Sequence, residues 1–271
     1  FFSHAASYAN NPNNPGSMFF DPETMDAQIN NPGWLKALED YKKGLDFNPP
    51  GSLNNGSGDV RPLYAGGKVA MNIDWADSGV LGATEGSIKG NVRTAVLPGS
   101  TEIWNHKTKA WDKFENPVAS PFLAFGGWQL AVPADSKNAE AAWSFVADVT
   151  SPEVSGKAIV TANTGVNPYR LSHYENVANW SAIFSEVEAT SYLAAQRASL
   201  DAPNVALDLR LPGFFAYTEV LELELSKALA GEVEPQVALD TIATEWNKLT
   251  DEFGREAELA AYRASMGLPP L

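Results

Sequence analysis

Short apolar segments alternate with helical patterns along this chain, and that alternation constrains its fold more than any other sequence feature. Every second residue is apolar at Val69, Met71 and Ile73, which predicts a strand over residues 68–73. Further strands are predicted over residues 92–97 and 125–132, with a hairpin-like excursion over 100–120. Helices are predicted over residues 32–45, 60–65, 138–149, 181–198, 214–230 and 235–262. This order predicts an α/β protein with a partly parallel sheet.

The composition excludes several classes of protein. A chain of 271 residues, 44% of them hydrophobic, can bury a large core, and we expect two lobes. No apolar run approaches the roughly 20 residues that span a bilayer. The net charge of −14 argues against nucleic acid and anionic membranes as partners. Because the chain has no cysteine, disulfides, thiolate metal sites and cysteine nucleophiles are excluded together.

Sequence patterns of enzymes and metal sites are scarce. His4, His106 and His173 lie far apart without the spacing of metal ligands, and we expect each to be a surface or loop histidine. The chain lacks the glycine-rich phosphate-binding patterns and the Gly-x-Ser-x-Gly pattern of serine hydrolases. We therefore expect no metal, no cofactor and no nucleophile.

Residues 125–132 carry the most information about function. Glycine lets the backbone adopt a positive φ and approach another surface closely, and Gly127 is followed directly by Trp128. An indole offers a flat apolar face with one N–H donor, which suits a sugar ring whose C–H face stacks on aromatic rings. The alternative is that Trp128 is buried and anchors a core strand.

Asp74 and Trp75 follow the predicted strand 68–73, and ligands of α/β sheets bind outside the carboxyl ends of strands. Together with Asp77, two carboxylates flank an indole. They can hydrogen-bond sugar hydroxyls while the ring stacks, or act as the acid and base of a glycosidase. Alternatively, Asp77 or Ser78 caps a helix that begins there.

Two later segments combine polar and aromatic side chains. The loop 163–170 is rich in hydrogen-bond donors, and Arg170 can bind two adjacent hydroxyls, a carboxylate ligand, or an acidic neighbour in an ion pair. The predicted helix 214–230 begins with Phe214, Phe215 and, two residues on, Tyr217. Successive helical positions diverge by about 100°, so at least one of these rings should be exposed or line a cleft.

Four stretches, in this order, are similar to the extracellular solute-binding proteins of ABC sugar importers, the maltodextrin-binding-like family. Residues 31–41 resemble a helix of that family that begins with proline, and residues 64–75 resemble its aromatic-x-x-Gly-Lys-x-Ala-Met-x-x-x-Trp motif. Residues 121–145 resemble its Gly-Gly-Trp strand and Ala-Trp-x-Phe helix, and residues 164–172 resemble the loop that follows. The ordered set covers nearly all of the chain.

The resemblance implies a periplasmic-binding-protein-like α/β fold with two lobes, here a mostly complete C-terminal lobe and part of the N-terminal lobe. Residues 1–120 are expected to form the first part of the C-terminal lobe. Residues 121–175 are expected to cross a hinge and form the partial N-terminal lobe, and residues 176–271 to form the helix-rich second part of the C-terminal lobe. The N-terminal stretch of the family, with its signal sequence, is expected to be missing.

The resemblance also implies a function. We expect a monomeric, non-enzymatic substrate-binding component of an ABC-type carbohydrate importer, periplasmic or lipid-anchored outside the cell. It would close two lobes on a sugar or oligosaccharide and deliver it to the membrane permease. By position, the expected ligand-binding residues are Asp74, Trp75, Gly127, Trp128, Asn167, Arg170, Arg210, Phe215 and Tyr217. The alternatives are a carbohydrate-active enzyme that uses a carboxylate pair, and a structural protein whose aromatic residues are all core.

Overall fold

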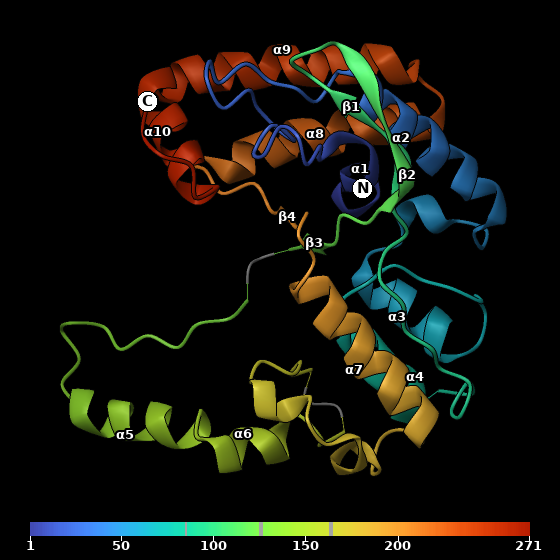
Figure 1. The fold of residues 1–271 in the computed structure, drawn as a ribbon, viewed down its shortest axis with the longest axis vertical. Coiled ribbons are helices and arrows are strands. Elements are labelled where there is room, and N and C mark those ends of the chain that lie inside the picture. The colour runs from blue at the N-terminus through green and yellow to red at the C-terminus, as the bar shows by residue number, and fades with distance from the viewer. Residues whose placement is uncertain (85, 125–126, 163–164) are drawn as a thin grey trace. The chain divides into compact units, whose positions relative to one another are not determined.

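The computed structural model describes residues 1–84, 86–124, 127–162 and 165–271 (Figure 1). Contacts within the chain divide it into two compact units. Unit 1 comprises Phe1–Asn54, Leu97–Gly126 and Ala202–Leu271, and unit 2 comprises Asn55–Val96 and Gly127–Asp201. These limits differ from the expected boundaries, since residues 55–96 and 176–201 belong to the same unit as 127–175. The assignment of segments to a C-terminal and an N-terminal lobe stays a prediction.

Unit 1 is mainly helical, with one hairpin that confirms the excursion expected at 100–120. Strands β1 (Ser100–Asn105) and β2 (Ala110–Val118) pair antiparallel, with Trp104 opposite Trp111. Strands β3 (Phe122–Leu123) and β4 (Ala206–Leu207) pair in parallel. The helices are α1 (Phe2–Ala9), α2 (Pro32–Gly44), α8 (Phe214–Ala230), α9 (Pro235–Phe253) and α10 (Arg255–Ser265), with 3₁₀ turns η1 (Leu45–Phe47) and η2 (Ser52–Asn54).

Local sequence explains where these helices begin and end. Asn31 Oδ1 accepts hydrogen bonds from the backbone N–H of Gly33 (2.9 Å) and Trp34 (3.2 Å), which caps α2. Gly231 ends α8 in the left-handed conformation, with φ +78°. The prediction of a single helix over 235–262 is wrong, because Gly254 adopts φ +97° and separates α9 from α10.

Four fully buried aromatic residues from both ends of the chain form the centre of the unit 1 core. Phe20 stacks on Trp246 with ring centroids 5.3 Å apart, and it packs edge-on against Tyr217 and Tyr262. Trp246 Nε1 donates to the Tyr217 carbonyl (2.9 Å), and the Tyr217 hydroxyl lies 3.1 Å from Thr250 Oγ1. The core therefore satisfies its polar atoms as well as its apolar surfaces.

One carboxylate attaches the hairpin to the N-terminal region of unit 1. Asp112, on β2, accepts hydrogen bonds at Oδ2 from the side-chain amides of Asn11, Asn13 and Asn105, each at 2.9 Å. The amides of Asn13 and Asn11 stabilise the charged form and lower the pKa of Asp112. The ionised side chain is thus the one that fits this network.

Unit 2 has a smaller core. Its elements are α3 (Ser57–Ala65), α4 (Asp77–Thr84), α5 (Ala139–Val149), α6 (Pro152–Ala158), η3 (Leu171–His173), η4 (Val177–Trp180) and α7 (Glu186–Leu200). Trp180, Phe184 and Tyr192 pack together at its centre. Glu188 forms a capping box with Ser185 at the start of α7 and also accepts the N–H of Val92 (3.0 Å). Every helix in the described residues is too short or too polar to cross a bilayer.

The three strands predicted for unit 2 are wrong. Residues 68–73, 92–97 and 127–132 form no β ladder with any described segment, and residues 125 and 126 lie outside the described residues. An alternating segment becomes a strand only when a neighbouring strand bonds its N–H and C=O groups. Met71 is consequently 86% exposed. Helix α5 forms as predicted, yet Trp143 and Phe145 on it are exposed as well.

Candidate functional site

Arg61, which the sequence analysis did not select, holds two carboxylates of the predicted site together in unit 2. From α3, its Nε donates to Asp74 Oδ2 (3.0 Å). Its Nη1 and Nη2 donate to the two oxygens of Asp77, at 2.9 and 3.0 Å. Trp75 lies between these acids in sequence, so we call Arg61, Asp74, Trp75 and Asp77 the Arg61 cluster. Its members come from α3, from the segment after 68–73 and from the first turn of α4.

The Arg61 cluster fixes the indole of Trp75. The guanidinium carbon of Arg61 lies 5.5 Å from the ring centroid, a cation–π contact, and Trp75 remains 44% exposed. Asp74 Oδ1 also accepts the backbone N–H of Trp75 (2.7 Å), and the Asp74 side chain is only 11% exposed. The cluster therefore presents a partly exposed aromatic face beside a carboxylate of fixed orientation.

The same geometry argues against an acid–base pair. Burial alone lowers the pKa of Arg61, but hydrogen bonds and charge from Asp74 and Asp77 raise it above its ordinary value. Arg61 is accordingly a permanent cation shared by both acids. A glycosidase needs one protonated and one ionised carboxyl group on opposite sides of the bond to be cleaved. Two carboxylates that bind the same guanidinium do not provide that arrangement.

The loop that contains Asn167 and Arg170 lies beside the Arg61 cluster. A Cβ atom on Gly165 (φ +62°) would lie 3.7 Å from Asp77 Oδ2. Asn167 Oδ1 accepts a hydrogen bond from the hydroxyl of the buried Tyr192 (3.3 Å), whose pKa is raised by burial. Residues 163 and 164, also part of the predicted loop, lie outside the described residues. The structure thus brings Asp74, Trp75 and Asn167 into one region of unit 2.

Arg170 is held by a carbonyl group rather than by the acidic neighbour that one alternative proposed. Its Nη2 donates to the backbone carbonyl of Thr150, and its guanidinium carbon lies 5.6 Å from the ring centroid of Tyr169. The side chain is partly exposed. Arg170 therefore has a defined orientation at the end of the loop 165–170.

The other predicted residues have mixed outcomes. In unit 2, Gly127 adopts φ +97° and Trp128 is 97% exposed, so the alternative that Trp128 anchors a buried core strand is wrong. In unit 1, Arg210 is exposed. Phe215 is exposed too, and at least one ring at the start of α8 was expected to be exposed. Tyr217 is a correction: it is fully buried against Trp246 and offers no surface on which a ligand could stack.

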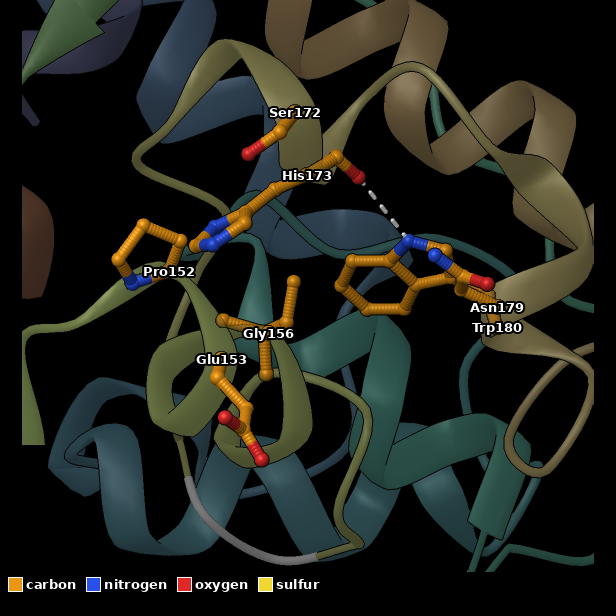
Figure 2. A pocket seen from close by; sticks show the side chains of 8 residues that line it. Pro152, Glu153, Gly156, Ser172, His173, Asn179 and Trp180 are labelled. Atoms are coloured by element: carbon orange, nitrogen blue, oxygen red, sulfur yellow. Dashed lines mark hydrogen bonds between the residues drawn. The ribbon is translucent and has the colours of Figure 1, made fainter.

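A cavity of about 360 Å³ lies in unit 2 between α6, η3 and η4 (Figure 2). His173 lines it from the 3₁₀ turn η3 and is only 5% exposed, so the expectation of a surface or loop histidine is wrong here. His106 is also buried, but it lies in the loop between β1 and β2, as one form of that expectation had it. The His173 carbonyl accepts a hydrogen bond from Trp180 Nε1 (3.2 Å), drawn in Figure 2. The residues that line the cavity are Pro152, Glu153, Gly156, Ile159, Ser172, His173, Asn179 and Trp180.

No group of histidine, aspartate or glutamate side chains in the described ranges is arranged to hold a metal ion. The candidate site consists of the Arg61 cluster and the loop 165–170. Both contain aromatic rings and polar side chains, which are groups able to stack and to form hydrogen bonds.

Comparison with solved structures defines the class of fold. The chain is similar to a D-mannitol-bound ABC transporter solute-binding protein of Agrobacterium vitis, with 24% identity and a TM-score of 0.64 over 93% of this chain and 58% of that one. It is similar to a ribitol-bound one of Agrobacterium radiobacter, with 21% identity and a TM-score of 0.63 over 90% and 56%. Maltose-bound MalE3 of T. maritima gives 20% identity and a TM-score of 0.62 over 85% and 54%. The fold is the α/β fold of periplasmic binding proteins, present in part.

Sequence comparison then identifies the family. Residues 8–155 match the bacterial extracellular solute-binding protein family, and the chain belongs to it. A mannitol-binding protein of Pseudomonas aeruginosa is 27% identical over 232 residues, which are 83% of this chain and 50% of that protein. A probable ABC transporter-binding protein of Deinococcus radiodurans is 28% identical over 150 residues, 55% of this chain and 31% of that protein. The chain thus spans about half, or less, of the length of these curated relatives.

Proposed function

We propose that this chain is part of the substrate-binding component of an ABC-type carbohydrate importer, and that Trp75 and Asp74 contact a sugar or a sugar alcohol. The observation that carries the proposal is the partly exposed Trp75 ring beside the fixed Asp74 carboxylate, in a chain of the solute-binding family. The protein would bind and release its ligand unchanged and deliver it to a membrane permease. We propose a monomer located outside the cytoplasmic membrane, as the extracellular designation of the family suggests.

The chemistry of the Arg61 cluster suits a polyhydroxylated ligand. An ionised carboxylate only accepts hydrogen bonds, and each hydroxyl of a sugar or sugar alcohol can donate one. Arg61 occupies part of the Asp74 oxygens and thereby orients the remaining lone pairs. The exposed part of the indole can cover the C–H face of the ligand. An amine would place its positive charge against a ring already in contact with the Arg61 cation, and a phosphate ester would place its negative charge beside the carboxylates of Asp74 and Asp77.

The relatives support the same class of ligand. D-Mannitol, ribitol and maltose, the molecules bound in the three similar structures, differ in length but are all neutral and rich in hydroxyl groups. Further contacts are proposed for the exposed Trp128 and Phe215 rings and for the polar groups of Gly127, Asn167, Arg170 and Arg210.

Calorimetry and thermal denaturation with D-mannitol, ribitol and maltose test the proposal. We expect saturable binding, a raised melting temperature and no product by chromatography. Trp75→Ala should weaken binding about tenfold or more, because a stacking aromatic is a typical hot spot. Trp143→Ala is the matched control, since Trp143 is also exposed in unit 2 but lies outside the Arg61 cluster. Stabilisation only by amines, metals or phosphate esters, or turnover of a sugar, would overturn the proposal.

A further inference from the structure

Both ring nitrogens of His173 are engaged, and together they fix its tautomer. Nδ1 accepts the backbone N–H of Tyr169 at 3.3 Å, so Nδ1 carries no proton. The proton of the neutral ring is therefore on Nε2, which lies 3.3 Å from Ser155 Oγ on α6. The Tyr169 ring also packs edge-on against the imidazole, with centroids 4.9 Å apart. Figure 2 shows the imidazole at the wall of the cavity, away from the Trp180 indole.

This arrangement holds the end of the loop 165–170. Tyr169 is 51% exposed, and the His173 ring is the acceptor that takes its backbone N–H into the interior of unit 2. On either side, the Pro168 carbonyl accepts from the Tyr174 hydroxyl (2.8 Å) and the Arg170 carbonyl accepts from the His173 N–H (3.0 Å). The backbone beside Arg170 and Asn167 is therefore held by contacts of residues 173 and 174, in addition to the bonds of the Arg170 side chain to Thr150 and of the Asn167 side chain to Tyr192.

The surroundings of His173 oppose a second proton on the ring. Burial lowers the pKa of His173, and the charge of Arg170 lowers it further. From α6, Glu153 lines the same cavity and forms an ion pair with Lys157 (2.8 Å) at the exposed surface. Asn179 and Trp180, from η4, are uncharged. Because the cavity borders the ring, water can deliver a proton there once the pH is low enough.

We propose that His173 is a positioning residue for the loop 165–170: the neutral ring holds the Tyr169 N–H and so places Arg170 and Asn167 for the ligand, and protonation of the ring releases them. A protonated imidazole has two donors and no acceptor, so it cannot keep the bond from the Tyr169 N–H. Ligand affinity of the wild-type chain should then fall at acidic pH. Only the part of this inference that concerns ligand affinity rests on the proposed function.

Two substitutions separate the roles of the two nitrogens. His173→Asn keeps an acceptor near the Nδ1 position, and the amide cannot be protonated. Gln reaches towards the Nε2 position and Ser155, and it lacks an acceptor beside the Tyr169 N–H. Each variant is compared with the wild-type chain by amide hydrogen exchange at Tyr169, by nitrogen NMR of His173 and by calorimetry with D-mannitol, at about pH 7.5 and about pH 4.5. Thermal denaturation reports on overall stability.

We expect His173→Gln to raise both Tyr169 exchange and the D-mannitol Kd about fivefold at neutral pH, the loss of one hydrogen bond. His173→Asn should resemble the wild type at neutral pH and lose the weakening of binding in acid. Equal Tyr169 exchange in both variants and the wild type, or a proton on Nδ1 in the NMR spectrum, would overturn the inference. If the wild type binds none of D-mannitol, ribitol and maltose, the proposed function fails, and Tyr169 exchange alone decides whether His173 holds the loop.

Discussion

Units 1 and 2 differ in how fully their large aromatic and aliphatic side chains are buried. In unit 1, Phe20 is surrounded by Tyr217, Trp246 and Tyr262, all fully buried. In unit 2, Trp180, Phe184 and Tyr192 form a compact centre, but several large apolar residues are exposed. These exposed residues of unit 2 include Met71, Ile73, Trp75, Trp128, Leu130, Trp143 and Phe145, and unit 1 exposes large apolar residues such as Phe47 and Phe215 as well.

The difference follows from what each kind of element needs. The helices of unit 1 bond their own backbones and bury one face against each other, so they are complete once packed. The alternating segments of unit 2 need a neighbouring strand, and none is paired with them in the described residues. Most of the candidate ligand-binding residues lie in unit 2, which has the smaller core and the more exposed aromatic surface. Stability and ligand binding should therefore respond to different substitutions.

The largest effect should be a difference between two tryptophans. Trp246→Ala in unit 1 should lower the free energy of unfolding by about 3–5 kcal/mol, because it empties the centre of a fully packed core. Trp128→Ala in unit 2 should change it by less than about 0.5 kcal/mol, because the side chain is 97% exposed. Urea unfolding followed by circular dichroism measures both. Similar losses for the two variants would erase the contrast between the units.

A smaller effect is expected at the Arg61 cluster. Arg61→Met removes charged hydrogen bonds to Asp74 and Asp77, and should lower the free energy of unfolding by about 1–3 kcal/mol. Arg197→Met is the control, since its ion pair with Asp201 is solvent-exposed and worth at most about 1 kcal/mol. Both are measured by urea unfolding. An Arg61 variant as stable as the control would show that the cluster contributes nothing to folding.

Tyr217 makes the unit 1 core sensitive to alkaline pH. Burial raises its pKa from the ordinary 10.0 to about 12, so the folded state favours the neutral hydroxyl. Its contribution to stability should be complete below pH 10.0 and be lost as the pH rises towards 12. Tyr217→Phe should cost about 1 kcal/mol at neutral pH and remove this part of the pH dependence. Tyr169→Phe, at a half-exposed site, is the control and should not lower the free energy of unfolding in this way. Urea unfolding of both variants at several pH values measures the difference.

The smallest effect should appear in acid, at Asp112. Its pKa is lowered by the amides of Asn13 and Asn11, so its contribution is present above the ordinary value of 3.8 and is lost as the pH falls through the folded-state pKa. Asp112→Asn should cost about 0.5–1 kcal/mol at neutral pH and flatten the acid limb of the stability curve. Glu102→Gln, an exposed change on β1, should leave that limb unaltered. If the acid limb is unchanged in the Asp112 variant, the hydrogen bonds from Asn11, Asn13 and Asn105 to Asp112 do not stabilise unit 1.

The sequence predicts features that depend on neighbouring residues better than features that depend on distant partners. Helix ends depend on residues within one turn: Asn31 and Ser151 cap the helices that follow them, and Gly231 ends α8. The strands at 68–73 and 127–132 depend on partners elsewhere, which the alternation of residues does not supply. The alternation of apolar residues in these two segments is real, but the strands that it predicted do not form.

The same limit applies to the candidate site. Helical geometry required one ring near the start of α8 to be exposed, but only packing against Trp246 and Thr250 determines that Tyr217 is the buried one. Arg61 escaped the sequence analysis because it lies 13 residues before Asp74, on another element. An arginine on a helix that precedes two nearby acids is a usable hint, but the pairing itself is tertiary.

The packing of Phe20 has a consequence for biosynthesis. Phe20 and its core partner Tyr262 are separated by 242 residues, so a ribosome that adds about 5–20 residues per second leaves Phe20 without that partner for roughly 12–50 s. The native packing of Phe20 is therefore completed only after residues 202–271, which carry Tyr217, Trp246 and Tyr262, have been synthesised.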